Sequence, residues 1–329
     1  MKIRMHYIIV MALLFIFGSG CSSDDDSLTI YSGRSEELLA PLVDKYQAEN
    51  PELDIQVRYG GSVELALLLQ EEGSKTPADI FISKSPGPVA YLADEGVLGI
   101  LPSEILSKSR GSDSENWVAI TGRQRVLVFN RDSVSASDLP NSIFDLVQPN
   151  WKGRVGIAPA NGSFQDFFTL FRLEYGDDVA LNWLKGMAEN DVIVYPKNSA
   201  IVQATARGEI DAGLVNHYYN ARLKLESPDT PSENHQFAVG DPGAITIATA
   251  ASVTKGSNKN AAEDFIQYLL GVDAQNYFAD ETLEYPVLDG IKPNERIGQS
   301  ILMEFGNFDA LGSGLEQTLE LIREAGFDI

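Results

Sequence analysis

The feature that most constrains the fold is a regular alternation of strand and helix patterns near the start of the chain. Apolar and polar residues alternate strictly over residues 53–59, which is the pattern of a strand with one buried face. Strand-like runs also lie at 28–31 and 78–82, and apolar residues recur at helical spacing within 35–46 and 62–69. Because units in this order build parallel sheets with right-handed crossovers, the sequence predicts an α/β fold.

A second set of strand and helix patterns follows a long β-rich stretch at 117–130. A strand of that length can run from one domain into another. Further strand-like runs lie at 154–158, 192–195 and 212–215, with helical patterns between them, and the apolar run at 244–253 is a candidate strand returning to the first set. The pattern therefore predicts two α/β lobes joined by two crossing strands.

We expect each lobe to be built from two separate parts of the chain. Lobe 1 comprises residues 28–122 plus 249–299, and lobe 2 comprises residues 123–248 plus 300–329. Ligands of open α/β sheets bind outside the carboxyl ends of the strands. We therefore place the binding site in the cleft between the lobes, with closure as a hinge motion.

The first residues of the chain are typical of an export signal. Lys2 and Arg4 precede an almost wholly apolar stretch, 7–17, which is too short to span a bilayer as a mature helix. We therefore predict a signal peptide over residues 1–20 and an exported protein.

The only cysteine of the chain, Cys21, directly follows this predicted signal peptide. Two small residues and then a cysteine resemble a bacterial lipobox, in which Cys21 is lipidated and becomes the first mature residue. Residues 21–27 would then form a polar tether that holds the protein at a membrane surface. The alternative is an ordinary cleavable signal with an incidental cysteine.

The composition of the chain excludes several classes of function. There are 25 Lys and Arg against 47 Asp and Glu, a net charge of −22, so nucleic acid is not an expected partner. A single cysteine excludes a disulfide scaffold, and the histidines outside the predicted signal peptide, His217 and His235, are too few for a three-histidine centre. Neither a Gly-x-Ser-x-Gly elbow nor a P-loop signature occurs, so we expect no enzymatic activity.

Two adjacent tyrosines are the strongest candidates for metal ligands. Tyr218 and Tyr219 follow the predicted strand 212–215, at the edge of a sheet where a cleft is expected. Phenolate oxygen is a hard, anionic donor suited to a hard cation such as Fe³⁺. On a regular helix neighbouring side chains diverge by about 100°, so we expect both to reach one ion only on irregular backbone. The alternative is an ordinary loop–helix junction in which the two rings simply pack.

A candidate anion site lies at Asn161, Gly162 and Ser163, where a strand ends and a helix begins. The free N–H groups and the dipole of such a helix start attract an anion. A plain N-cap by Asn161 or Ser163 is an equally good explanation of the segment.

Three further residues stand near the expected cleft. Arg123, at the predicted hinge, could pair with an anion there, or form a surface salt bridge instead. Arg34 and Ser35 follow the first strand, where they either face the cleft or form a turn and an N-cap.

Taken in order along the chain, five segments resemble the ferric-iron-binding subgroup of the solute-binding proteins of bacterial ABC importers. The segments are 28–34, 77–81, 117–123, 151–156 and 213–219. The last contains the tyrosine pair and is the most specific of the five. The likeness extends from residue 28 to about residue 290.

This resemblance implies a two-lobed periplasmic-binding-protein type II fold and a monomeric, extracytoplasmic carrier that delivers ferric iron to a membrane permease. It implies that Tyr218 and Tyr219 are iron ligands. It also implies a site for a synergistic anion, carbonate or phosphate, in the same cleft. The residues implied at the anion site are Asn161, Gly162, Ser163 and Asn216, with Arg123 and Asn198 as further contacts.

The sequence departs from this subgroup at three positions. Where many relatives supply a histidine after the first strand, this chain has Ser35, and where some supply a glutamate after the third strand it has Lys84. The segment that in others supplies a third tyrosine reads 161–163 here. At most two protein ligands of the family type remain. A cleft that takes an oxyanion, a polyamine or an iron chelate instead of bare Fe³⁺ therefore stays open as an alternative, and Lys84 favours an anionic ligand.

Overall fold

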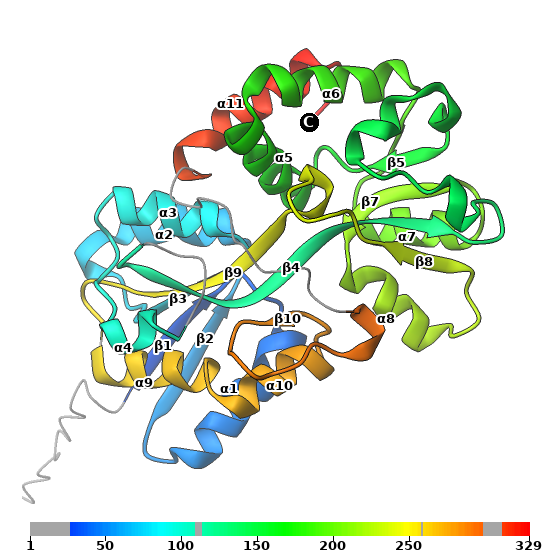
Figure 1. The fold of residues 1–329 in the computed structure, drawn as a ribbon. Helices are drawn as coiled ribbons and strands as arrows, with labels where there is room; N and C mark the ends of the chain where they lie inside the picture. The colour runs from blue at the N-terminus through cyan, green and yellow to red at the C-terminus, as the bar shows by residue number, and fades with distance from the viewer. Residues whose placement is uncertain (1–26, 109–113, 258, 299–310) are drawn as a thin grey trace, which may run out of the picture.

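A computed structural model describes residues 27–108, 114–257, 259–298 and 311–329, and shows two lobes built on one mixed sheet (Figure 1). The sheet has the strand order β2-β1-β3-β9-β4-β7-β5-β6, with β10 and β8 paired to β4. Its strands are β1 (Ser27–Ser32), β2 (Asp54–Tyr59), β3 (Ile80–Ser83), β4 (Trp117–Asn130), β5 (Val155–Ile157), β6 (Ile193–Val194), β7 (Ala212–Asn216), β8 (Ser232–His235), β9 (Thr246–Val253) and β10 (Tyr285–Pro286).

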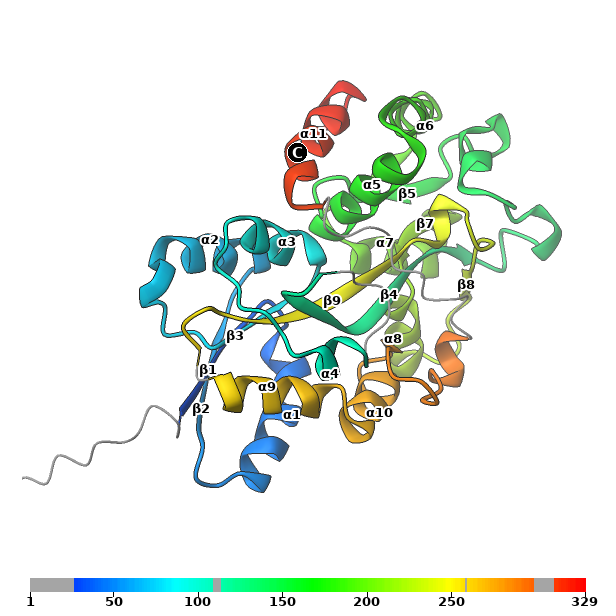
Figure 2. The same ribbon diagram turned by 60° about the vertical axis from the view of Figure 1, so that its left-hand side comes forward.

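The helices cover both faces of this sheet (Figure 2). In that view α2 and α3 lie on the opposite side of the first lobe from α1, α9 and α10, and in the second lobe α5 and α6 lie opposite α7 and α8. The bounds are α1 (Glu36–Glu49), α2 (Ser62–Glu72), α3 (Pro86–Asp94), α4 (Ser103–Leu106), α5 (Gly162–Tyr175), α6 (Asp177–Glu189), α7 (Asn198–Ala206), α8 (Tyr218–Glu226), α9 (Lys259–Leu269), α10 (Val272–Asp280) and α11 (Leu311–Glu324).

Strand β4 joins the two lobes. It is buried along its whole length, pairs with β9 from Trp117 to Gln124, and pairs with β7 from Arg125 to Phe129. The long strand predicted at 117–130 and the two-lobed α/β fold are thus confirmed. The predicted lobe boundaries at 122/123 and 248/249 stay a prediction. They fall inside β4 and inside β9.

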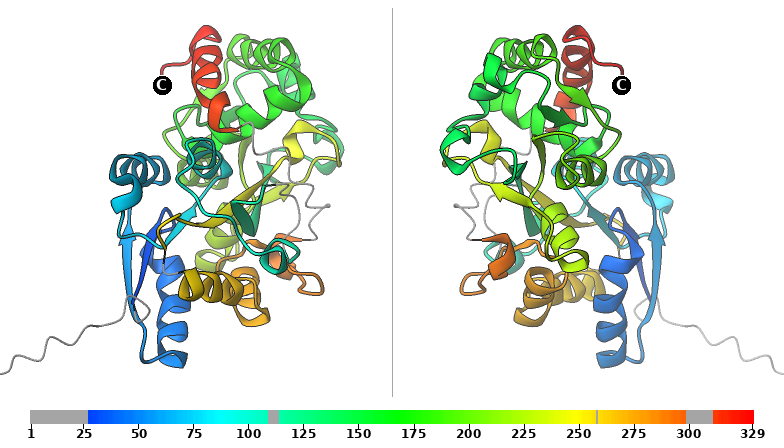
Figure 3. Two further views of the ribbon diagram at one scale, coloured as in Figure 1. Left: turned by 90° about the vertical axis from the view of Figure 1, so that its left-hand side faces the viewer. Right: turned by 90° about the vertical axis from the view of Figure 1, so that its right-hand side faces the viewer.

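The two lobes are also in contact through the last helix. Helix α11 packs against α3 of the first lobe and α5 of the second, and lies beside α5 and α6 in Figure 3. On the α5 side the guanidinium of Arg172 donates to the carbonyl of Gly314 over 2.7 Å, and the hydroxyls of Thr169 and Thr318 are 2.6 Å apart. Because α11 touches both lobes, it lies across one side of the space between them.

The structure differs from the sequence prediction mainly in the last third of the chain. The sequence patterns of residues 258–329 are mainly helical. In the structure, however, Tyr285–Pro286 forms β10 against β4, and the described residues 287–294 are irregular. The predicted signal peptide and all of the tether except Ser27 lie outside the described residues, as does Cys21. Within the part that is described, no helix is both long and apolar enough to cross a bilayer.

Candidate metal centre in the interlobe cleft

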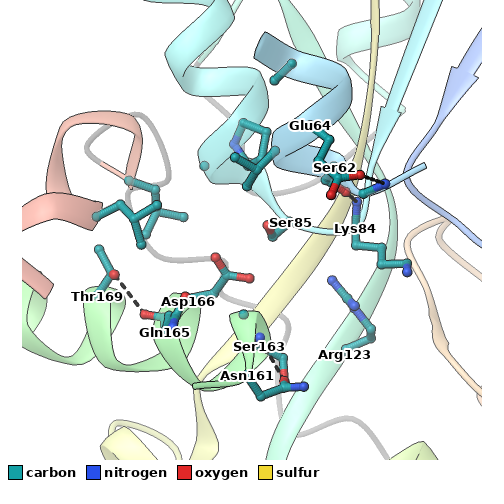
Figure 4. Close-up of a pocket in the computed structure, with 18 of the residues that line it drawn as sticks. Ser62, Glu64, Lys84, Ser85, Arg123, Asn161, Ser163, Gln165, Asp166 and Thr169 are labelled. Atoms are coloured by element: carbon teal, nitrogen blue, oxygen red, sulfur yellow. Dashed lines mark hydrogen bonds between the residues drawn. The ribbon is translucent and has the colours of Figure 1, made fainter. Parts of the chain in front are cut away.

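A cavity of about 700 Å³ lies between the lobes, below α2 and α3 and beside the start of α5 (Figure 4). Lobe 1 contributes hydroxyl, charged and apolar side chains, and lobe 2 contributes phenols, amides and a carboxylate. The polar and aromatic lining residues are Ser35, Ser62, Glu64, Lys84, Ser85 and Tyr91 from the first lobe, and Asn161, Ser163, Gln165, Asp166, Thr169, Tyr218, Tyr219 and Arg222 from the second, with Arg123 on β4 between them.

The tyrosine pair lies on the wall of this cavity. Tyr218 and Tyr219 are the first two residues of α8, so they lie on regular helix rather than on the irregular backbone we expect from the sequence. Their rings nevertheless come together, with centroids 4.4 Å apart and an interplanar angle of 28°. Neighbouring positions on a helix point in different directions. Because no preceding turn crowds the first turn of α8, the two tyrosine side chains can nevertheless turn toward each other.

A buried histidine holds the start of α8 in place. The Nδ1 of His217 accepts a hydrogen bond from the backbone N–H of Gln124 (3.1 Å), and its Nε2 donates to the carbonyl of Leu283 (2.9 Å). Its ring stacks on Tyr285 with centroids 4.3 Å apart. Burial lowers the pKa of His217 to about 4, so the ring is neutral at neutral pH and its two nitrogens are already used. His217 therefore positions the tyrosines and is not itself free to bind a metal.

The phenol of Tyr218 is held in its protonated form. Burial, followed by the neighbouring Tyr219 phenol, raises the pKa of Tyr218, while the positive charge of Arg123 acts in the opposite direction. The guanidinium of Arg222 lies 4.5 Å from the centroid of the Tyr218 ring and donates to the carbonyl of Thr282 over 2.7 Å. A strongly charged cation at the two hydroxyls would have to displace their protons, as Fe³⁺ does when it binds phenols.

The predicted anion segment forms the N-terminus of α5 and also lines the cavity. Asn161 is the N-cap, and its Oδ1 accepts from the backbone N–H of Ser163 (3.1 Å) and from the Ser163 hydroxyl (2.7 Å). The side chain of Asn198 donates to the same hydroxyl over 2.8 Å, while its buried Oδ1 has no hydrogen-bond partner. The segment is thus an N-cap that also opens onto the cavity, and the anion site there stays a prediction.

Arg123 and Asp166 bring opposite charges to the same wall. Arg123 is only 6% exposed, and its Nε has no hydrogen-bond partner. Figure 4 shows the Asp166 carboxylate pointing across the cleft toward Ser85. Burial raises the pKa of Asp166 to about 6, partly offset by Arg123 and by the hydroxyl of Ser85. Asp166 on the second lobe thus interacts with Ser85 on the first lobe across the cleft.

Three predicted site residues lie behind the cavity wall. Arg34 forms a buried ion pair with Glu284 (2.8 Å), and the Asn216 Oδ1 accepts from Arg125 over 3.2 Å. Asn198 reaches the cavity only indirectly, through hydrogen bonds to Ser163 and Asn161. The structure does bring Ser35, Lys84 and Arg123 to the lining, together with the tyrosine pair and residues 161–163.

Asp166, Arg222 and the serines Ser62 and Ser85 also line the cavity, although no sequence motif singles them out. Helical spacing could have indicated two of them. Asp166 lies three residues after Ser163 on α5, and Arg222 lies four residues after Tyr218 on α8, so each shares a helix face with a predicted site residue.

Within the described residues, no group of three or more His, Cys, Asp or Glu side chains could hold a metal ion. A metal in this cleft would therefore depend on the phenols. The paired tyrosines, the open helix start and Arg123 together offer donors for a hard cation and a place for an anion beside it.

Comparison with known proteins places this architecture in a family. The model of the bacterial extracellular solute-binding proteins matches residues 75–310. The chain is 32% identical to the major ferric iron-binding protein of Neisseria meningitidis serogroup B over 268 residues, which cover 79% of this chain and 80% of that protein. It is 28% identical to the Fe(3+)-binding periplasmic protein of Serratia marcescens over 99% of both chains.

Solved structures agree with this result. The fold matches the iron-bound structure of HitA from Pseudomonas aeruginosa with a TM-score of 0.83 and 29% identity, over 92% of this chain and 99% of that one. A family model that covers most of the chain, relatives aligned along nearly its whole length and a shared two-lobed fold agree with one another. The chain therefore belongs to the bacterial extracellular solute-binding proteins and is similar to their ferric-iron-binding members.

Proposed function

We propose that this protein binds ferric iron and a synergistic anion, carbonate or phosphate, in the interlobe cleft and delivers the iron to the permease of an ABC importer. The observation that carries the proposal is the stacked pair Tyr218 and Tyr219, which shares one cavity with the open N-terminus of α5. The similarity to the ferric iron-binding proteins of Neisseria meningitidis and Serratia marcescens supports the same cargo.

The site supports this cargo chemically. Fe³⁺ is a hard cation that prefers anionic oxygen donors, and two phenolates supply them without any histidine or cysteine. The anion completes the coordination from the α5 side, where the N–H groups of the first turn and the guanidinium of Arg123 attract negative charge.

The test is a titration of the metal-free protein with Fe³⁺ in carbonate or phosphate buffer, followed by visible absorbance. We expect a phenolate-to-iron charge-transfer band that Tyr218→Phe and Tyr219→Phe each weaken or abolish. Tyr91→Phe is the matched control, because Tyr91 lines the same cavity from α3 and should leave the band unchanged. Absence of the band with every anion would refute ferric iron as the cargo.

We further propose that the protein is exported, that Cys21 carries a lipid anchor and that the mature protein is a monomer. The single cysteine directly after the predicted signal peptide supports the anchor. Substitution of Cys21 by serine should release the protein from the membrane fraction. Retention of the Cys21→Ser protein in that fraction would contradict the lipid anchor.

A further inference from the structure

The first-lobe wall of the cavity differs from what a bare metal ion requires. Its lining side chains are hydroxyls, apolar groups, Lys84 and one carboxylate. Among the lining residues of that wall the carboxylate is Glu64, and it accepts a hydrogen bond from the backbone N–H of Gly61 at the start of its own helix. The wall that closes over the tyrosine pair is therefore not built to add metal ligands.

Lys84 instead brings a positive charge to the cavity. It is exposed there, and the described part of the chain shows no ion pair for it. Its backbone N–H donates to the hydroxyl of Ser62 over 3.0 Å, which fixes the strand end from which the side chain extends. Partial burial lowers the pKa of Lys84, the nearby charges of Arg123 and Arg34 add to this effect, and the carboxylate of Glu284 opposes it.

Lys84 and Arg123 therefore face one space with like charges. Figure 4 shows both side chains extending into the same side of the cleft. Arg34, behind them, already has Glu284 as its partner, but Arg123 is buried with an unsatisfied Nε. Two cations in this position are stabilised by an anion with more than one charged oxygen.

The same cavity has an apolar side. Val63 and Leu67 on α2 are each 52% exposed and line it, together with Leu315 on α11. The volume of about 700 Å³ lies in the range of roughly 300–1,000 Å³ that is typical of pockets for organic molecules. An ion and a carbonate need much less space and no apolar contact.

The number of oxygen ligands that a ferric ion needs also points to an organic anion in the cavity. This step rests on the proposed function. Tyr218 and Tyr219 offer two donors to a ferric ion, which takes several more oxygen ligands. Lys84 cannot be one of them, because an ammonium group has no lone pair to donate. The missing donors and the missing negative charge are both provided if the iron arrives already bound to an anionic chelator.

We propose that the cargo is a negatively charged ferric chelate of a small organic polycarboxylate. Its iron binds the tyrosine pair, its outer carboxylates bind Lys84 and Arg123, and its carbon skeleton packs on the α2 wall.

The test compares ferric citrate with Fe³⁺ in carbonate, using native mass spectrometry for composition and competition titration for affinity. The wild-type protein should retain one citrate with each iron. Lys84→Glu should weaken ferric citrate binding at least tenfold and strengthen binding of Fe³⁺ with carbonate, because it exchanges the cation for a metal-ligating carboxylate. Lys75→Glu makes the same charge change on an exposed residue of the same lobe that is not among the cavity lining, and should do neither.

The proposal is overturned if the wild type sheds the citrate and binds iron alone, or if Lys84→Glu binds ferric citrate as well as the wild type. Lys84→Gln, which removes the charge without adding a ligand, should weaken the chelate without improving Fe³⁺ with carbonate. Circular dichroism of each variant confirms that the fold is intact. Failure of the proposed function looks different, since the wild type would then show no tyrosinate band with either source of iron.

Discussion

The two walls of the cleft divide the chemistry of the site unequally. The second lobe presents two stacked phenols, an amide-capped helix start and the carboxylate of Asp166. The first lobe presents serines, Lys84 and an apolar strip on α2. One wall suits a hard cation and the other suits an organic anion.

This difference shows in which lobe the chain departs from the ferric-iron carriers that it resembles. The departures with clear structural counterparts, Ser35 and Lys84, are on the first lobe and line the cavity. The tyrosine pair on the second lobe is kept.

The largest expected effect lies beneath the first-lobe wall. Arg34 and Glu284 are nearly fully buried and 2.8 Å apart, so Glu284→Gln leaves the Arg34 charge without a partner. We expect a loss of about 3–5 kcal/mol in the free energy of unfolding, measured by urea denaturation. Glu324→Gln breaks the exposed pair with Lys185 and should cost about 1 kcal/mol or less. Equal losses in the two variants would show that Arg34 does not depend on Glu284.

The second prediction concerns the phenols of the other wall. Because the pKa of Tyr218 is raised above its usual value, its hydroxyl is protonated at pH 5–8 and metal binding must release that proton. Iron affinity should therefore rise with pH, by up to about tenfold per pH unit for each phenol proton that the metal displaces. Competition titrations across this range, together with proton release measured by calorimetry in buffers of different ionisation enthalpy, test it. An affinity that does not change with pH would contradict phenolate ligation.

Much of the fold could be predicted from the sequence because its signals are local. The strict alternation at 53–59 and the long β-rich stretch at 117–130 each indicate a strand without help from distant residues. The sequence pattern indicates helix α3 less clearly, because Pro86 and Pro88 lie in its first turn and weaken the helical pattern. Proline is nevertheless well accommodated at a helix start.

The site could be predicted only in part, since the direction of a side chain depends on distant partners. Asn216 and Arg34 are turned away from the cavity because Arg125 and Glu284, far from them in sequence, hold their polar atoms. Asp166 and Arg222 face the cavity because of how α5 and α8 pack against the sheet. Local motifs identified the tyrosine pair, but only the packing of the lobes reveals which neighbours join it.

A third prediction adds a ligand to the poorer wall. Ser35 lines the cavity on the first lobe, at the position where the resemblance to the ferric-iron carriers leads us to expect a histidine. Ser35→His should place an imidazole near the tyrosine pair and increase the affinity for Fe³⁺ with carbonate by about tenfold, or about 1.4 kcal/mol. Ser35→Asn, which is similar in polarity but a poor ferric ligand, is the control. If the two variants bind iron equally, a side chain at position 35 is too far away to contact iron bound at the tyrosine pair.

The smallest effect tests whether an anion occupies the start of α5. Asn161→Ala removes the N-cap hydrogen bonds to Ser163 and should cost about 1 kcal/mol of stability, whereas Asn161→Gly should cost only a few tenths. An anion at the freed N–H groups takes over the role of the cap. The loss in Asn161→Ala should therefore shrink when Fe³⁺ and phosphate are both present, as measured by urea unfolding with and without them. If the loss stays the same, the anion binds elsewhere, and Arg123 and Lys84 become the groups that hold it.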